Sequence, residues 1–159
     1  MGVSGVGKSR LGVALGERLG WEFVDGDDLH PAGNIAKMSA GEPLTDEDRW
    51  PWLDAIGARL AASEAPLLLA CSALKRAYRD RLGMGDEGIF FLHLSGETDI
   101  IAGRLDKRQG HFMARTLLDD QVSTLEPLGS DEFGARLDIR APFTDVLEGA
   151  ERLLRGQGA

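Results

Sequence analysis

Apolar residues follow two kinds of spacing along this chain, and each kind predicts a different secondary structure. Residues 9–19 carry leucine at every fourth position, which is the spacing of one face of an α-helix. The apolar runs at residues 66–72 (PLLLACS) and 89–94 (IFFLHL) are continuous instead. Continuous runs are typical of strands in a parallel sheet, because both faces of such a sheet are covered.

Helices and strands are predicted to alternate over the rest of the chain. Thr45 and Asp48 resemble a capping box, and Pro51 suits the first turn of the helix that follows. The alternation indicates an α/β fold around a parallel sheet, and since no linker interrupts it, residues 1–159 are expected to form one domain. The further predicted strands are at residues 21–24 and 136–139, and the further predicted helices are at 31–40, about 45–62, 73–82, 98–108, 113–124 and 143–154.

The first residues of the chain carry a phosphate-binding motif. Residues 2–9 (GVSGVGKS) match the pattern G-x-x-x-x-G-K-[ST] directly before the first predicted helix. Glycines let several backbone N–H groups point at phosphate oxygens, and the helix adds the positive end of its dipole. Lys8 is expected to reach the β- and γ-phosphates, and the Ser9 hydroxyl to ligate Mg²⁺. The residues predicted to bind a nucleoside triphosphate are Gly2, Val3, Ser4, Gly5, Val6, Gly7, Lys8 and Ser9.

This loop indicates a nucleoside triphosphate but does not identify the acceptor of the phosphate. The chain lacks the N-K-x-D element by which GTPases recognise guanine, and its 159 residues are too few for a motor or a large ATPase. Size and motif together favour a small phosphotransferase.

Three aspartates follow the strand predicted at residues 21–24, at the end where a parallel sheet binds ligands. A hydroxyl that attacks a γ-phosphate needs a nearby carboxylate to orient it and to accept its proton. Asp25, Asp27 and Asp28 are these residues. Asp25 and Asp27, one residue apart, could divide this task and metal binding between them, or a turn at Gly26 could direct both inward. The alternative is a solvated acidic turn.

Composition excludes several classes of partner. Apolar residues make up 43% of the chain and charged residues 28%, and the formal net charge is −8. An acidic protein is a poor match for nucleic acid, and no apolar run approaches the roughly 20 residues of a membrane span. Cys71 is the single cysteine and has no internal disulfide partner, so a reducing cytoplasm is expected. We therefore expect no nucleic-acid partner, no membrane partner and a cytoplasmic location.

Five blocks occur in order between residue 2 and about residue 128. They are GVSGVGKS, DGDDLHPAGNIAKMSAGEPLTDEDRWPWL, CSALKRAYRDRL, RLDKRQGHFM and QVSTLEPL. Together they resemble gluconokinases of the small bacterial P-loop type, which are relatives of shikimate and nucleoside-monophosphate kinases. The resemblance implies phosphorylation of D-gluconate to 6-phospho-D-gluconate by ATP with Mg²⁺, in a homodimeric enzyme.

The same resemblance implies the architecture of the domain. It is a P-loop NTPase fold of the nucleoside-monophosphate-kinase type, a three-layer sandwich whose parallel sheet has the order 2-3-1-4-5. A lid is expected around residues 104–115, and a helical substrate-binding segment around residues 28–62.

Gluconate combines a carboxylate with a row of hydroxyls, so its site needs a cation and hydrogen-bonding side chains. Each candidate also has a structural alternative: Lys37 could lie on a solvated helix face, and Arg49 could pair with Asp46 or Asp48. Lys75 and Arg79 are four residues apart, which would place them on one helix face. The substrate-binding residues predicted from the matching blocks are Asp27, His30, Lys37, Arg49, Lys75 and Arg79.

The block RLDKRQGHF resembles the mobile lid of these kinases. Arg104 and Arg108 are expected to close over the transferring phosphate and to neutralise the charge that develops there. The alternative is an amphipathic helix with solvated arginines.

Many P-loop proteins place a metal-binding aspartate where this chain has residues 71–72 (Cys-Ser), so Mg²⁺ is expected to rely on Ser9 and Asp25. Adenine is expected near residues 138–142.

One element of the family fold has no counterpart in the sequence. The first, central strand precedes the phosphate loop and needs about five apolar residues, whereas Met1 alone precedes it here. The strands at residues 66–72 and 89–94 would then face each other across a gap, and each unpaired buried backbone group there would cost about 1–3 kcal/mol. The protein could begin upstream, it could be a shortened and weakly active form, or another segment could fill the gap. We expect the first.

Two alternatives to a gluconate kinase remain open. One is a kinase of another small hydroxy acid or of a nucleoside monophosphate, because few contacts determine the acceptor. The other is a nucleotide-binding protein with little turnover. The absent strand favours this second alternative, whereas the retention of Lys8, Ser9, Asp27 and Arg108 argues against it.

Overall fold

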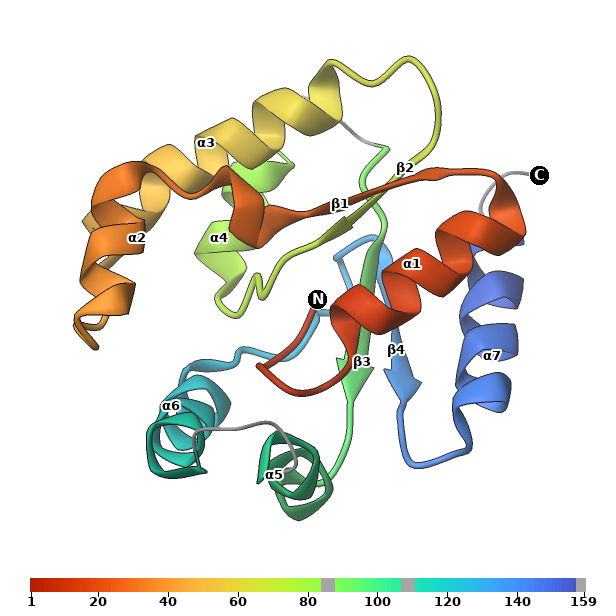
Figure 1. The fold of residues 1–159 in the computed structure, drawn as a ribbon. Coiled ribbons are helices and arrows are strands. Elements are labelled where there is room, and N and C mark those ends of the chain that lie inside the picture. The colour runs from red at the N-terminus through yellow and green to blue at the C-terminus, as the bar shows by residue number, and fades with distance from the viewer. Residues whose placement is uncertain (84–87, 107–110, 157–159) are drawn as a thin grey trace.

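Helices and parallel strands alternate along the chain in the computed structural model, which describes residues 1–83, 88–106 and 111–156, with the backbone alone for 106 and 111–116 (Figure 1). The strands are β1 (Glu22–Asp25), β2 (Leu67–Ala70), β3 (Phe91–Ser95) and β4 (Gly134–Asp138). The helices are α1 (Lys8–Leu19), α2 (Ala32–Ser39), α3 (Asp46–Ala61), α4 (Arg76–Leu82), α5 (Thr98–Asp106), α6 (His111–Thr124) and α7 (Phe143–Arg155), with a 3-10 helix, η1 (Gly26–Leu29). The predicted α/β alternation is confirmed.

The strands form two parallel pairs among the described residues. β1 pairs with β2 from Glu22 opposite Leu67 onward, and β3 pairs with β4 from Phe91 opposite Gly134 onward. The order β1-β2 and the order β3-β4 agree with the predicted sheet when its first strand is left out. The expected gap therefore lies between β2 and β3.

Met1 and Gly2 connect the two pairs at one end of this gap. The Met1 amino group donates to the Leu92 carbonyl at 2.6 Å, and the Leu94 N–H donates to the Met1 carbonyl at 3.0 Å. On the other side, the Gly2 N–H donates to the Ser72 carbonyl at 3.1 Å. The two residues thus behave as the last part of a central strand.

Two apolar clusters support the two halves of the molecule. The larger one includes Val6, Leu11 and Leu94 and lies among α1, β3, α5, α6 and α7. The smaller one is built on Trp52 and Ile56 of α3 and on residues of α4. α1 packs on β1, β2 and α7 (Figure 1). This helix links the two halves.

Local signals in the sequence explain the start of α3. The Thr45 side chain accepts a hydrogen bond from the Asp48 N–H, and the Asp48 carboxylate accepts one from the Thr45 N–H. This is the predicted capping box. Pro51, which was predicted in the first turn, is instead the sixth residue of the helix, so it removes one intrahelical hydrogen bond.

Arg79 has a structural position, which corrects the expectation that it contacts substrate. Its side chain is 1% exposed and pairs with Glu132 at 2.5 Å and 3.0 Å, while four backbone carbonyls accept its remaining N–H groups. The prediction assumed a helix from residue 73, but α4 begins at Arg76 and Lys75 is extended. Lys75 and Arg79 therefore do not share a helix face.

Gly26 allows η1 to approach β2 closely, which gives a test of the packing. A Cβ at Gly26 would lie 2.5 Å from the Ala70 carbonyl oxygen, whereas one at Gly33 of α2 would meet nothing within 4 Å. We expect Gly26→Ala to lower the free energy of unfolding by about 1–3 kcal/mol. Gly33→Ala should raise it by about 0.4–1 kcal/mol, because it restricts the unfolded chain. Urea denaturation measures both, and equal stabilities would contradict this packing.

The buried Arg79–Glu132 pair gives a second test. Arg79→Ala leaves a buried carboxylate without its partner, and we expect it to lower the free energy of unfolding by about 3–5 kcal/mol. Arg76→Ala is the control, because Arg76 pairs with Asp131 at the surface and exposed pairs contribute little. Thermal or urea unfolding compares the two variants. Similar small losses in both would mean that Arg79 is not structural.

Candidate active site

The phosphate loop has the backbone geometry of an anion-binding nest. Gly2, Gly5 and Gly7 have φ angles of 134°, 81° and 104°, in the region that favours glycine. Gly7 precedes α1 and offers no side-chain cap, so the first N–H groups of this helix are left for a ligand. The loop and the positive end of the helix dipole therefore suit a phosphate group.

Lys8 bends back over this loop. Its ammonium donates to the Gly2 carbonyl at 2.9 Å and to the Val3 carbonyl at 3.1 Å. Burial lowers the pKa of Lys8, and the negative charge of Asp27 is the largest opposing influence. A nearby anion would stabilise the charged form of a buried ammonium whose hydrogen bonds go to carbonyls, and a triphosphate would supply that anion.

Ser9 joins the start of α1 to the end of β1. Its hydroxyl donates to the Asp25 carboxylate at 2.6 Å. Asp25 also accepts a hydrogen bond from the Asp27 N–H at 3.2 Å, as the N-cap of η1. The segment after β1 is therefore a helical turn, which corresponds to the predicted turn at Gly26 and not to an extended segment. Asp27 and Asp28 lie in this turn with exposed side chains.

The oxygens of Ser9 and Asp25 are of the type that Mg²⁺ binds. The described residues include no group of three or more histidine, cysteine, aspartate or glutamate side chains arranged for a metal ion. Mg²⁺ does not require such a group, because it keeps several waters and takes one or two protein ligands beside substrate phosphates. The Ser9–Asp25 pair fits this pattern.

η1 is attached to α3 through a buried tryptophan. The Trp52 indole N–H donates to the Gly26 carbonyl at 2.7 Å, and the His30 ring stacks on Trp52 with centroids 4.2 Å apart. Burial lowers the pKa of His30, so its ring is neutral at physiological pH and one nitrogen can accept a hydrogen bond. His30 Nδ1 lies 3.2 Å from Asn34 Nδ2.

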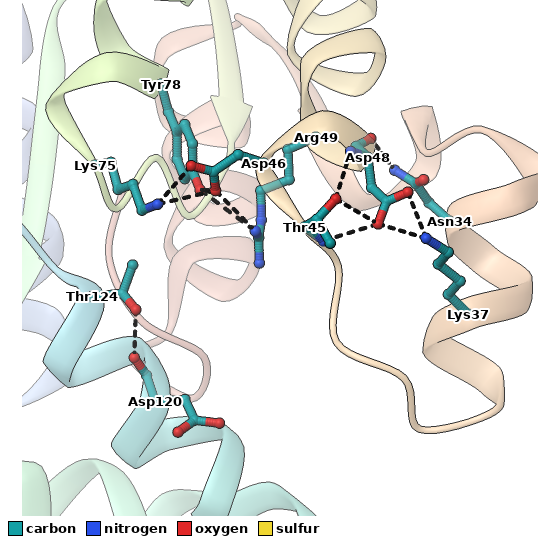
Figure 2. Close-up of polar contacts among 10 residues, drawn as sticks. All are labelled: Asn34, Lys37, Thr45, Asp46, Asp48, Arg49, Lys75, Tyr78, Asp120 and Thr124. Carbon is teal, nitrogen blue, oxygen red and sulfur yellow. Dashed lines mark hydrogen bonds and ion pairs between the residues drawn. The ribbon is translucent and has the colours of Figure 1, made fainter.

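Two carboxylates at the start of α3 hold three of the predicted substrate-binding cations (Figure 2). Asp46 contacts Lys75 at 2.7 Å and Arg49 at 3.5 Å, and it also accepts a hydrogen bond from the Tyr78 hydroxyl. Lys75 is the main reason that the pKa of Asp46 lies below its usual value. The alternative proposed for Arg49, pairing with Asp46, is what the structure contains.

Lys37 is engaged in the same way by Asp48. Its ammonium lies 2.7 Å and 2.8 Å from the two carboxylate oxygens (Figure 2). Lys37 and the Thr45 N–H together lower the pKa of Asp48 to about 2. Lys37 therefore ties α2 to α3, and its side chain is partly exposed.

Part of the predicted lid can be placed. Arg104 donates to the Ile139 carbonyl at 3.0 Å and to the Val6 carbonyl at 3.4 Å, so it connects α5 with the phosphate loop and with the region expected to hold adenine. In that region Asp138 and Arg140 pair with each other at 2.6 Å. Arg108 lies outside the described residues, with the rest of residues 107–110 of the lid block.

Gln121 is a site residue that sequence reasoning missed. Its side-chain oxygen accepts a hydrogen bond from the Ser4 N–H at 2.6 Å, across 117 positions of sequence. Gln121 lies within the block QVSTLEPL, which was the one signal that could have identified it. Tyr78 was missed as well, although it lies in the block CSALKRAYRDRL.

The structure therefore brings Lys8, Ser9, Asp25 and Asp27 together at one edge of the strands. Asp46, with the side chains of Lys75, Arg49 and Tyr78 that contact it, lies close to the start of α4. Among the described residues, no helix has the length and apolar character that crossing a bilayer requires.

Comparisons with known proteins agree on the family. No family model matches the chain. A gluconokinase of Gluconobacter oxydans is 48% identical over 136 residues, covering 83% of this chain and 76% of that protein. A solved gluconokinase from Sinorhizobium meliloti is 46% identical with a TM-score of 0.87, covering 99% and 91% of the two chains. The APS kinase of Mycobacterium tuberculosis, at 19% identity and a TM-score of 0.69 over 98% and 94%, shares the fold. The chain belongs to the gluconokinase family.

Proposed function

We propose that this chain transfers the γ-phosphoryl group of ATP to a hydroxyl of D-gluconate and so produces 6-phospho-D-gluconate. The observation that carries the proposal is the Ser9–Asp25 contact of 2.6 Å, which joins the phosphate loop to the aspartate-bearing turn. A donor site and an acceptor site are thereby adjacent, as a direct transfer requires.

The donor half of the site is built from the phosphate loop. Its N–H groups and the start of α1 bind the phosphates, while Lys8 moves from the carbonyls of residues 2 and 3 to the β- and γ-phosphates. Ser9 and Asp25 would hold Mg²⁺, and the bound ion would neutralise phosphate charge. Arg104, and Arg108 beyond the described residues, add positive charge at the lid.

The acceptor half is centred on Asp27. Its carboxylate orients the gluconate hydroxyl and accepts its proton, while the hydroxyl oxygen forms a bond to the γ-phosphorus and the bond from that phosphorus to the β-phosphate oxygen breaks. The negative charge of Asp27 partly opposes the lowering of the Lys8 pKa by burial. The proton acceptor is therefore close to the group that binds the phosphate.

The carboxylate of gluconate would compete with Asp46 for Lys75 and Arg49. Both cations are half-exposed and already assembled on one carboxylate, so an incoming carboxylate finds two charges in place. His30 is influenced by the charge of Arg49, and Lys37 pairs with Asp48 in the first turn of α3, so both are proposed to offer contacts for the hydroxyls. Arg79 is left out of the set because its N–H groups are occupied.

A homodimer and a cytoplasmic location are also proposed. The buried, unpaired Cys71 is compatible with a reducing compartment, and burial raises the pKa of its thiol to about 11. The dimer is proposed from family resemblance.

A coupled assay of ADP formation tests the function. We expect turnover with ATP and D-gluconate to exceed turnover with shikimate, other hydroxy acids or nucleoside monophosphates. Asp27→Asn should lower kcat by about 10²–10⁴-fold, because it removes the proton acceptor. Asp28→Asn is the matched control and should change kcat little, since this neighbour is given no role.

Other outcomes of this assay would replace the proposal. Preferred turnover of another acceptor would assign the site to that compound. ATP binding without phosphate transfer to any acceptor would support a nucleotide-binding protein with little turnover. Unchanged kcat in Asp27→Asn would place the proton acceptor elsewhere.

The role of Lys75 is tested through the KM for gluconate. Lys75→Met should raise this KM by about 10–100-fold, the size of one lost charge-assisted contact, and should change the KM for ATP much less. Arg76→Met is the control, because the neighbouring Arg76 pairs with Asp131 and Asp80 at the surface. Equal effects on both KM values would indicate a general disturbance of the fold.

A further inference from the structure

The segment that joins β2 to α4 contains a strained residue. Ala73 has a φ angle of 44°, and in the described part of the chain it is the one residue other than glycine with such an angle. It is also 2% exposed. A residue in this conformation persists only where the surrounding structure holds it there, and such strain is common near functional sites. We call residues 72–75 the Lys75 turn.

Arg79 holds the strained part of the Lys75 turn directly. Its Nη1 group donates to the Ala73 carbonyl at 3.1 Å and to the Leu74 carbonyl at 3.2 Å. The Glu126 N–H also donates to the Leu74 carbonyl, at 2.9 Å. The turn is therefore fixed by hydrogen bonds to its backbone from a buried side chain and from the segment that follows α6.

The opposite edge of the Arg79 guanidinium is fixed by Glu132. Nε and Nη2 lie 2.5 Å and 3.0 Å from the two carboxylate oxygens, and the side chains of Arg79 and Glu132 are 1% and 6% exposed. A guanidinium group is planar and presents its N–H groups in a rigid fork. The pairing with Glu132 therefore also determines where Nη1 points.

The Lys75 turn directs the Lys75 side chain toward α3. Lys75 comes two residues after Ala73, and its backbone is extended, with φ −91° and ψ 149°. Its ammonium lies 3.0 Å and 2.7 Å from the two carboxylate oxygens of Asp46 (Figure 2). A change in the φ angle of Ala73 would rotate the chain that follows it, so the position of this ammonium depends on the strained conformation.

We propose that Arg79 is a positioning residue of the acceptor site, because its hydrogen bonds to the Ala73 and Leu74 carbonyls hold the conformation from which Lys75 reaches Asp46 and the substrate carboxylate. The proposal rests on the proposed function, which assigns Lys75 to that carboxylate. Burial of the Arg79–Glu132 pair then affects substrate binding as well as the stability of the fold.

Arg79→Lys tests this role. A lysine keeps the charge that pairs with Glu132 but lacks the fork that reaches the two carbonyls as well. We expect the pKa of Asp46, followed by NMR, to rise toward its usual value, since Lys75 is the largest cause of its lowering. The KM for gluconate should rise about 3–30-fold, and the KM for ATP should change much less.

Leu147→Ala is the control for a general loss of stability. Leu147 is a buried residue of α7, which packs on α1 and β4, and its truncation leaves a cavity there. We expect this variant to lower Tm but to leave the pKa of Asp46 and the KM for gluconate unchanged. If Arg79→Lys does not fold, Arg79→Met combined with Glu132→Met takes its place with the same expected changes, because this pair leaves no unpaired buried charge.

A double variant shows whether Arg79 acts through Lys75. Arg79→Lys added to Lys75→Met should raise the KM for gluconate no further, because the side chain that it positions is already absent. A further rise as large as that in the native background would overturn the proposal. A lower Tm in Arg79→Lys with an unchanged pKa of Asp46 would also overturn it, since Arg79 would then be structural alone.

The pKa of Asp46 separates this proposal from the proposed function, because its measurement needs no turnover. A raised pKa in Arg79→Lys with an unchanged KM for gluconate in Lys75→Met would support the hold of Arg79 on the turn and remove Lys75 from the acceptor site. An unchanged pKa with a raised KM in Lys75→Met would overturn the role of Arg79 and leave the acceptor site as proposed.

Discussion

The carboxyl ends of parallel strands meet at one edge of a sheet, and the whole candidate site depends on that edge. The phosphate loop follows Met1, η1 follows β1, and Lys75 comes shortly after β2. Side chains far apart in the sequence become neighbours only because these strand ends are aligned. The Ser9–Asp25 hydrogen bond of 2.6 Å is the direct contact between two of them. It adds a side-chain link to the packing of α1 on β1 and β2.

Cations of the site are held by the protein's own acceptors. Lys75 lies on Asp46, Lys37 on Asp48, and Lys8 on two backbone carbonyls. In a chain with a net charge of −8, such local pairing lets an anionic substrate find positive charge despite unfavourable long-range repulsion. Under the proposed function, binding of the substrate carboxylate would replace the contacts that Asp46 makes with these cations. The charge contribution to binding would then nearly cancel, and the hydroxyls would determine selectivity.

The sequence predicted the elements more accurately than the contacts between them. Leucine spacing, continuous apolar runs and the Thr45–Asp48 capping box are local signals, and each of them is present in the structure. η1 was not predicted as a helix, because a single turn has no periodicity to detect. Arg79 was assigned to the site because the helix was expected to start three residues early. Gln121 and Tyr78 act through partners 117 and 32 positions away, and no local pattern encodes such distances.

The phosphate loop is held by contacts from several elements. In a continuous sheet, a loop of this kind is fixed by the two ladders of the strand before it. Here its start is fixed by the Met1 contacts with β3 and by the Gly2–Ser72 hydrogen bond, and its middle by the Ser4–Gln121 hydrogen bond. The partners in these bonds belong to β3, to the segment after β2 and to α6. Each bond can hold the loop in place only if the element that carries the partner is itself firmly packed. The two apolar clusters supply this packing on either side of the gap. Val6 of the loop and Leu11 of α1 both belong to the larger cluster, so the loop is packed together with the helix that follows it. The packing of α1, which follows the loop, therefore determines the geometry of the phosphate site as much as the contacts of Met1 and Gly2, which begin it.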